Sequence, residues 1–229
     1  MRTFILIHGA GDSGWYWHLV ASDLRARGYE VIAPDLPADD DALTLSDYAD
    51  AVIPLAEGRE HVTVVGHSFG GFTAPLVAEA LAAEQLIYLA GMVPMPGETP
   101  DAWWTNTGYN EAVARQAAHD GGLTGNPDPL IEFYHDVPSA LAQEALRRRR
   151  NHPSPAAMAH PWPAAALPEM PTRFILCQDD RCFPADFFRA LIAERLGLTP
   201  EEIPGSHCVA LSRPAELADL LIAPRRAHI

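Results

Sequence analysis

With 229 residues, 48% of them hydrophobic, the chain can bury one large core, so a single domain with an insertion fits better than two independent domains. The formal net charge of −14 argues against a nucleic-acid-binding surface, and the absence of lysine excludes Schiff-base chemistry and a P-loop lysine. No apolar run approaches a membrane span and the first residues do not form a secretory signal pattern, so we expect a cytoplasmic protein that does not bind membranes.

The predicted elements alternate along the chain. Short apolar runs predict strands that are buried on both faces of a sheet, at residues 4–7, 29–33, 62–65, 86–90 and 173–177. Helical patterns at residues 15–27, 46–57 and 70–83 separate the first four strands. A helix at 185–196, a short strand at 201–203 and a helix opened by Pro214 follow. This alternation predicts an α/β fold with a doubly wound, mostly parallel sheet.

The alternation fails between residues 95 and 170, where helical patterns at 111–119 and 139–150 have no matching strands. The sequence therefore predicts a core of residues 1–94 and 171–229 with a helical cap inserted at 95–170, over the strand ends where open α/β sheets bind ligands. The alternative is a loose surface excursion. Trp103, Trp104 and Trp162 favour a cap, because such large apolar side chains normally cover a surface.

A glycine-serine motif lies at the end of the third predicted strand, where Val62–Val65 is followed by Gly66-His67-Ser68-Phe69-Gly70. The G-x-S-x-G spacing between a strand and a helix is typical of a nucleophile elbow, in which flanking glycines let strand and helix approach closely. We therefore expect Ser68 to be a catalytic nucleophile exposed above the sheet.

A serine nucleophile needs a neighbouring imidazole to take its proton and a carboxylate to orient that imidazole. Asp179 and Asp180 follow the strand at 173–177, and His207 follows the strand at 201–203, so all three lie at carboxyl ends of strands. One of the two aspartates could instead cap the helix that begins near Pro184. His207 could also be a loop histidine without a special partner.

An oxyanion hole needs two backbone N–H groups, one from the residue after the nucleophile and one from the loop after the first strand. Phe69 and Ala10 occupy these positions. The loop around Ala10 matches neither glycine-rich phosphate-binding pattern, which argues against a nucleotide site. We expect Trp15, Trp103 and Trp104 to contact substrate, with Trp15 or Trp17 lining an acyl pocket.

Other polar groups are better explained by packing or solvation. Packing is expected for Cys208, since no elbow presents its sulfur. The acidic residues 39–41, near Asp35, predict a solvated loop, and the arginines at 147–150 a solvated helix end. We predict no metal ion and no cofactor, because neither the cysteines nor the cap histidines have ligand spacing: Cys177, Cys182 and Cys208, and His119, His135, His152 and His160.

Four segments together resemble the α/β-hydrolase superfamily, and within it the small methylesterase and hydroxynitrile lyase-like branch. They are Ile7-His8-Gly9-Ala10 with residues 14–17, residues 66–71, residues 177–184, and Gly205-Ser206-His207. The resemblance implies Ser68 as nucleophile, His207 as base, Asp180 as acid, and Ala10 and Phe69 as oxyanion donors. Cyanohydrin-cleaving members carry a lysine after the catalytic histidine. This chain has Cys208 there, so lyase activity is not expected.

These observations predict a serine hydrolase that cleaves small to medium, largely apolar carboxylic esters through an acyl-enzyme. The same residues could act on a thioester, a lactone or a biosynthetic intermediate. A hypothesis of another class is a ligand-binding receptor that keeps the hydrolase scaffold without turnover. The oligomeric state is left open.

Overall fold

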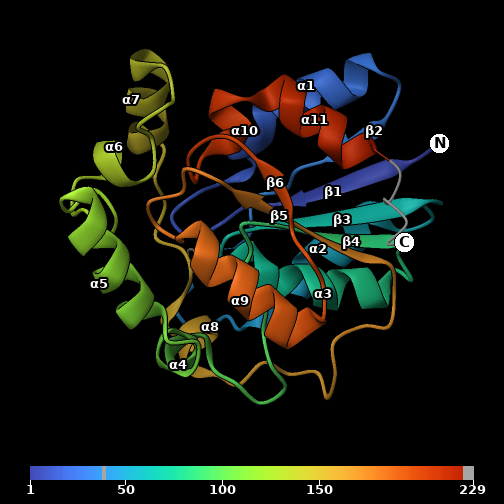
Figure 1. Ribbon diagram of the computed structural model, residues 1–229. Coiled ribbons are helices and arrows are strands. Elements are labelled where there is room, and N and C mark those ends of the chain that lie inside the picture. Colours follow the sequence, from blue (N-terminus) through green and yellow to red (C-terminus); the bar gives the residue numbers. More distant parts are fainter. Residues whose placement is uncertain (38–39, 224–229) are drawn as a thin grey trace.

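A parallel sheet forms the centre of the computed structural model, which describes residues 1–37 and 40–223 (Figure 1). Its strands lie in the order β2-β1-β3-β4-β5-β6, and every neighbouring pair runs parallel. The bounds are β1 Thr3–Ile7, β2 Glu30–Ile32, β3 Val62–His67, β4 Gln85–Leu89, β5 Thr172–Cys177 and β6 Glu201–Ile203. The predicted α/β class with a parallel sheet is confirmed.

Helices cover both faces of this sheet (Figure 1). Helix α1 (His18–Ala26), α10 (Val209–Ser212) and α11 (Pro214–Ile222) lie on one side. Helix α2 (Leu45–Val52), α3 (Gly70–Ala80) and α9 (Ala185–Leu196) lie on the other. The central strands are therefore shielded from water on both faces, and every residue of β1 and β3 is buried.

Two predicted helices begin or end differently because of local hydrogen bonding and proline. The helix predicted at 15–27 starts as a 3-10 turn, η1 (Gly14–Trp17), where the Ser13 side chain accepts a hydrogen bond from the Trp15 N–H. The helix predicted at 46–57 corresponds to α2, which ends at Val52, and a 3-10 turn, η2 (Ile53–Ala56), follows it directly. Pro54 lacks the N–H that a longer α-helix would need.

The described segment between β4 and β5 consists of helices and loops and has no strand. Its helices lie at the left and bottom of Figure 1: α4 (Pro100–Asn106), α5 (Tyr109–Asp120), α6 (Pro129–Glu132), α7 (Ser139–Arg147) and α8 (Pro155–Ala159). Two of its tryptophans are buried and hydrogen-bonded to the core, one to the loop after β4 and one to α3. The Trp103 indole N–H donates to the Val93 carbonyl at 3.0 Å, and that of Trp162 donates to the Phe72 carbonyl at 2.9 Å. We therefore propose the same division, with residues 95–170 as an inserted segment over the core.

Two sequence expectations extend beyond the described residues. Asp39, part of the predicted acidic loop, and residues 224–229, part of the predicted core, lie outside them. Asp40 accepts a hydrogen bond from the Ala42 N–H at an exposed position. In the described residues, no helix is long and apolar enough to cross a membrane.

Candidate active site

Ser68 lies on a sharp turn between β3 and α3. Its φ of 51° is in the left-handed region, which non-glycine residues rarely adopt. The flanking glycines are required by close approach: a Cβ on Gly66 would lie 2.6 Å from the Ala74 Cβ, and one on Gly70 would lie 2.6 Å from the His8 carbonyl oxygen. The turn therefore has the geometry of a nucleophile elbow, with Ser68 at the end of a buried strand.

A buried histidine and carboxylate pair lies beside this turn. The His207 Nδ1 is 2.7 Å from the Asp180 Oδ2, and the Asp180 side chain is fully buried. The other carboxylate oxygen, Oδ1, accepts hydrogen bonds from the N–H groups of Cys182 and Phe183 at 2.8 and 2.9 Å. The carboxylate is thus fixed by its own loop while Oδ2 faces the imidazole.

Asp179, the neighbouring aspartate, has a different position. Its Oδ2 accepts a hydrogen bond from the Gly205 N–H at 2.9 Å, and its own N–H donates to the Gly205 carbonyl at 3.1 Å. Asp179 therefore joins the loop after β5 to the loop that carries His207. In the described structure its carboxylate forms no hydrogen bond with the imidazole of His207, which pairs with Asp180 instead.

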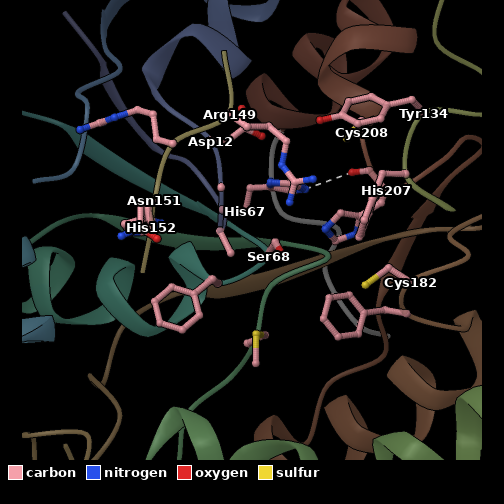
Figure 2. Close-up of a pocket in the computed structure, with 18 of the residues that line it drawn as sticks. Asp12, His67, Ser68, Tyr134, Arg149, Asn151, His152, Cys182, His207 and Cys208 are labelled. Atoms are coloured by element: carbon pink, nitrogen blue, oxygen red, sulfur yellow. Dashed lines mark hydrogen bonds between the residues drawn. The ribbon is translucent and has the colours of Figure 1, made fainter. Parts of the chain in front are cut away.

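The backbone of His207 is held by two side chains from the other half of the core. The His67 Nε2–H donates to the His207 carbonyl oxygen at 3.0 Å, the dashed line in Figure 2, and the Tyr16 hydroxyl donates to the same oxygen at 3.4 Å. Burial lowers the pKa of His67 well below its usual value, so its ring is neutral. The residue before Ser68 thus positions the loop that presents His207.

The loop after β1 lies directly against Ser68. A Cβ on Gly9 would be 2.8 Å from the Ser68 Cβ, which shows how closely this backbone approaches the serine. Ala10 and Phe69 both line the cavity at Ser68. Neither backbone N–H donates a hydrogen bond to another residue in the described parts of the chain. Both amides are therefore available to a substrate oxygen.

A cavity of about 380 Å³ lies over Ser68, between the sheet edge and the inserted segment (Figure 2). This volume is at the small end of the range for ligand pockets. One part of its wall is largely apolar and includes Phe69, Met92, Trp104, Phe133 and Phe183. The polar side chains that line it include Asp12, Tyr134, Arg149, Asn151 and His152.

The three tryptophans predicted to contact substrate have different positions. Trp104 lines the cavity. Trp103 is completely buried beneath it and contacts Trp104 edge to face, and Trp15 stacks on His18 with the Arg148 guanidinium 5.0 Å from its ring. Neither Trp15 nor Trp103 is among the residues that line this cavity. Trp103 supports the cavity wall indirectly, through its contacts with Trp104 and Phe183.

Burial shifts the pKa of several groups that line the cavity. It raises the pKa of Asp12 to about 7, and a hydrogen bond with the Ser13 backbone and the charge of Arg149 oppose this shift only in part. It also raises the pKa of the Cys182 and Cys208 thiols well above their usual value. Both thiols are therefore protonated, in agreement with the packing role expected for Cys208.

Sequence reasoning did not identify Asp12, Phe133, Tyr134 or Arg149 as residues of the site, and it considered His152 only as a metal ligand. Asp12 could have been found, since it lies two residues after Ala10 in the loop predicted to form the oxyanion hole. The other four belong to the inserted segment, and no motif connects them with Ser68. Their places depend on how that segment folds over the sheet.

Comparison with known proteins agrees with this geometry. Residues 4–220 match the model of the alpha/beta hydrolase family. Salicylic acid-binding protein 2 of Nicotiana tabacum is 29% identical, with 96% of each chain covered, and methylesterase 7 of Arabidopsis thaliana is 26% identical, covering 96% of this chain and 95% of the relative.

Among solved structures, that of polyneuridine aldehyde esterase superposes with a TM-score of 0.78 over 97% of this chain and 98% of the other. At 21% identity this likeness concerns the fold. The similarities confirm the predicted α/β-hydrolase fold and methylesterase-like branch, and they support an esterase that acts on small apolar esters.

Proposed function

This chain belongs to the α/β-hydrolase family, and we propose that it is a serine esterase with Ser68, His207 and Asp180 as its catalytic triad. One observation carries the proposal. The cavity that contains Ser68 on its strained turn is also lined by His207, whose Nδ1 is 2.7 Å from a buried carboxylate. A serine, an imidazole and a buried carboxylate are the groups that together convert a hydroxyl into a nucleophile.

Each residue has one task in the reaction. His207 accepts the Ser68 proton through Nε2 while Oγ attacks the ester carbonyl, and Asp180 holds the imidazole by its Nδ1–H. The N–H groups of Ala10 and Phe69 donate to the developing oxyanion. His207 then gives its proton to the leaving alcohol. A water molecule, activated by the same imidazole, releases the acid from Ser68.

The cavity and the relatives support the substrate class. Aromatic and methionine side chains form much of the wall, and a volume of about 380 Å³ suits a small to medium ester with a largely apolar acyl part. Methylesterase 7 is named for the hydrolysis of methyl esters, which makes a methyl ester the first substrate class to examine. The absence of lysine from the whole chain argues against cyanohydrin cleavage.

A receptor without turnover is the second candidate. Salicylic acid-binding protein 2, similar over 96% of this chain, is named for binding, which keeps this possibility in the test. A receptor would bind esters or their acids, or acylate once, without releasing product repeatedly. The presence of both Ser68 and His207 in the wall of one cavity supports catalysis over binding alone.

The deciding experiment follows nitrophenolate release from p-nitrophenyl acetate and butyrate through the burst and the steady state. Wild type should turn over, and Ser68→Ala should lose at least a thousandfold in kcat, roughly as for other triad serines. Ser46→Ala, at an exposed position in α2, is the matched control and should keep full activity. A fluorophosphonate should label one site, on the peptide that contains Ser68.

Each outcome decides between the candidates. A burst without steady-state release would favour the receptor. Release that persists in Ser68→Ala would reject the proposed nucleophile.

A further inference from the structure

His152 lies in the inserted segment, close to both predicted oxyanion donors. Its carbonyl accepts a hydrogen bond from the Gly11 N–H at 2.7 Å, which joins it to the loop that carries Ala10. Its ring meets that of Phe69 edge to face, with centroids 5.7 Å apart. In Figure 2, Ser68 lies between His152 on one side and His207 on the other.

The ring of His152 is buried and neither of its nitrogens has a hydrogen-bond partner in the described residues, although the nearby backbone of Gly9 acts to raise its pKa. The residue is 5% exposed. Burial lowers the pKa of His152 to about 3, so the imidazole is neutral at any working pH. A neutral imidazole presents one N–H donor and one acceptor nitrogen, and leaving both unpaired in a buried position is unfavourable.

No polar group around His152 forms a hydrogen bond with its ring nitrogens in the described residues. His8, whose ring centroid is 5.0 Å away, is bonded through Nδ1 to the Gly9 carbonyl and through Nε2 to the Leu36 N–H. The Tyr48 hydroxyl accepts a hydrogen bond from the Ser154 N–H. His152 itself lines the cavity over Ser68. A molecule in that cavity is therefore the natural partner for its nitrogens.

We infer that His152 forms a specificity subsite that hydrogen-bonds a neutral hydroxyl group of the substrate, so that the preferred ester carries a hydroxyl remote from the reacting carbonyl. A hydroxyl both donates and accepts, so it can pair with either ring nitrogen. The aromatic residues of the cavity wall, among them Phe133 and Phe183, suit an apolar part of the substrate between its hydroxyl and its ester group. This inference rests on the proposed function for the identity of the ligand as an ester.

The test uses methyl phenylacetate with a hydroxyl at ring position 2, 3 or 4, each paired with the ester that has a methyl group at the same position. The methylene group insulates the carbonyl from the ring, so the two members of a pair differ little in intrinsic reactivity. The measured quantity is the ratio of kcat/KM within each pair. This ratio cancels any general loss of activity or of folded enzyme.

At least one hydroxylated isomer should be preferred by about tenfold or more in wild type, because a buried hydrogen-bonding group discriminates against a partner that lacks the hydroxyl. His152→Phe, which preserves the ring packing, should bring the ratio close to one. His152→Asn, which keeps a donor and an acceptor, should restore part of the preference. His160→Phe, at an exposed histidine of the same segment, should leave the ratio at its wild-type value.

Binding of the same esters to Ser68→Ala and Ser68→Ala/His152→Phe, measured by calorimetry, tests the subsite without turnover. A binding preference that disappears with His152→Phe supports the inference even where no ester is hydrolysed, in which case only the proposed function fails. The inference is overturned by ratios near one for every isomer in wild type, as for a ring solvated by water alone. A preference that survives His152→Phe overturns it equally.

Discussion

Asp180 and His207 share a short hydrogen bond, 2.7 Å between Oδ2 and Nδ1, whereas the adjacent Asp179 binds the backbone of Gly205. The two aspartates follow the same strand, yet their carboxylates contact different parts of one loop. This relationship separates a group that holds the imidazole from one that holds the loop around it.

The first prediction concerns these two carboxylates. Asp180→Asn should lower kcat by roughly a thousandfold or more, because an amide N–H facing Nδ1 favours the tautomer whose Nε2 carries a proton and cannot accept one from Ser68. Asp179→Asn should be mild, since its amide oxygen can still accept from the Gly205 N–H. Steady-state kinetics on p-nitrophenyl butyrate checks both. The reverse ranking would move the acid by one residue.

Gly9→Ala tests the close approach of the loop after β1. The new methyl group would lie 2.8 Å from the Ser68 Cβ, so the loop must move and carry the Ala10 N–H with it. We expect kcat to fall roughly tenfold to a hundredfold, since small displacements of catalytic groups have effects of this size. Gly97→Ala is the control for general backbone strain, because its φ of 73° strains an added Cβ while Gly97 does not line the cavity over Ser68. Equal kcat values for Gly9→Ala and wild type would argue against the Ala10 N–H as an oxyanion donor.

The raised pKa of Asp12 predicts a dependence of stability on pH. In the native state this carboxyl ionises at about pH 7, but in the unfolded chain near its ordinary value of about 4. Between these pH values the native state therefore binds more protons than the unfolded chain. The stability that Asp12 contributes is present at low pH and is lost as the pH rises towards 7.

Asp12→Asn removes this loss. The free energy of unfolding of the variant minus that of wild type should be larger at pH 8.5 than at pH 5.5, by about 1 kcal/mol or more. Urea unfolding at both pH values measures the difference, with Glu57→Gln at an exposed position as the control. A difference between variant and wild type that does not change with pH would contradict the raised pKa.

A buried ion pair should contribute strongly to stability. Arg195 and Glu98, whose side chains are 8% and 5% exposed, join α9 to the start of the inserted segment at 2.7 Å. Glu98→Gln leaves the guanidinium without its counter-charge and should lower the free energy of unfolding by about 3 kcal/mol.

Glu144→Gln provides the comparison, because Glu144 pairs with Arg147 and Arg148 at the surface of α7. Solvent screens these pairs, so a clearly smaller loss is expected. Thermal unfolding of both variants under the same conditions gives the ranking. Similar losses would show that burial of the Arg195–Glu98 pair adds little.

Much of the fold could be predicted because its signals are local. Strands covered on both faces consist almost wholly of apolar residues, and the predicted bounds of α9 and β6 agree with the structure to the residue. The helix predicted at 139–150 ends earlier, at Arg147, and α4, α6 and α8 were not predicted. Short helices held by tertiary contacts leave little periodicity in a sequence.

The elbow at Ser68 and the order of serine, aspartate and histidine were likewise readable from the chain, since each depends on residue types at short spacing around a strand end. The sequence by itself thus determined the architecture and the positions of Ser68 and His207. Chain order left both Asp179 and Asp180 open, and the family resemblance implied Asp180. Only the tertiary structure decided that Asp180 meets the imidazole, and that Trp104 and His152 line the cavity while Trp15 does not. Those outcomes depend on contacts between segments far apart in the chain, where side-chain direction and loop packing select partners that local patterns do not specify.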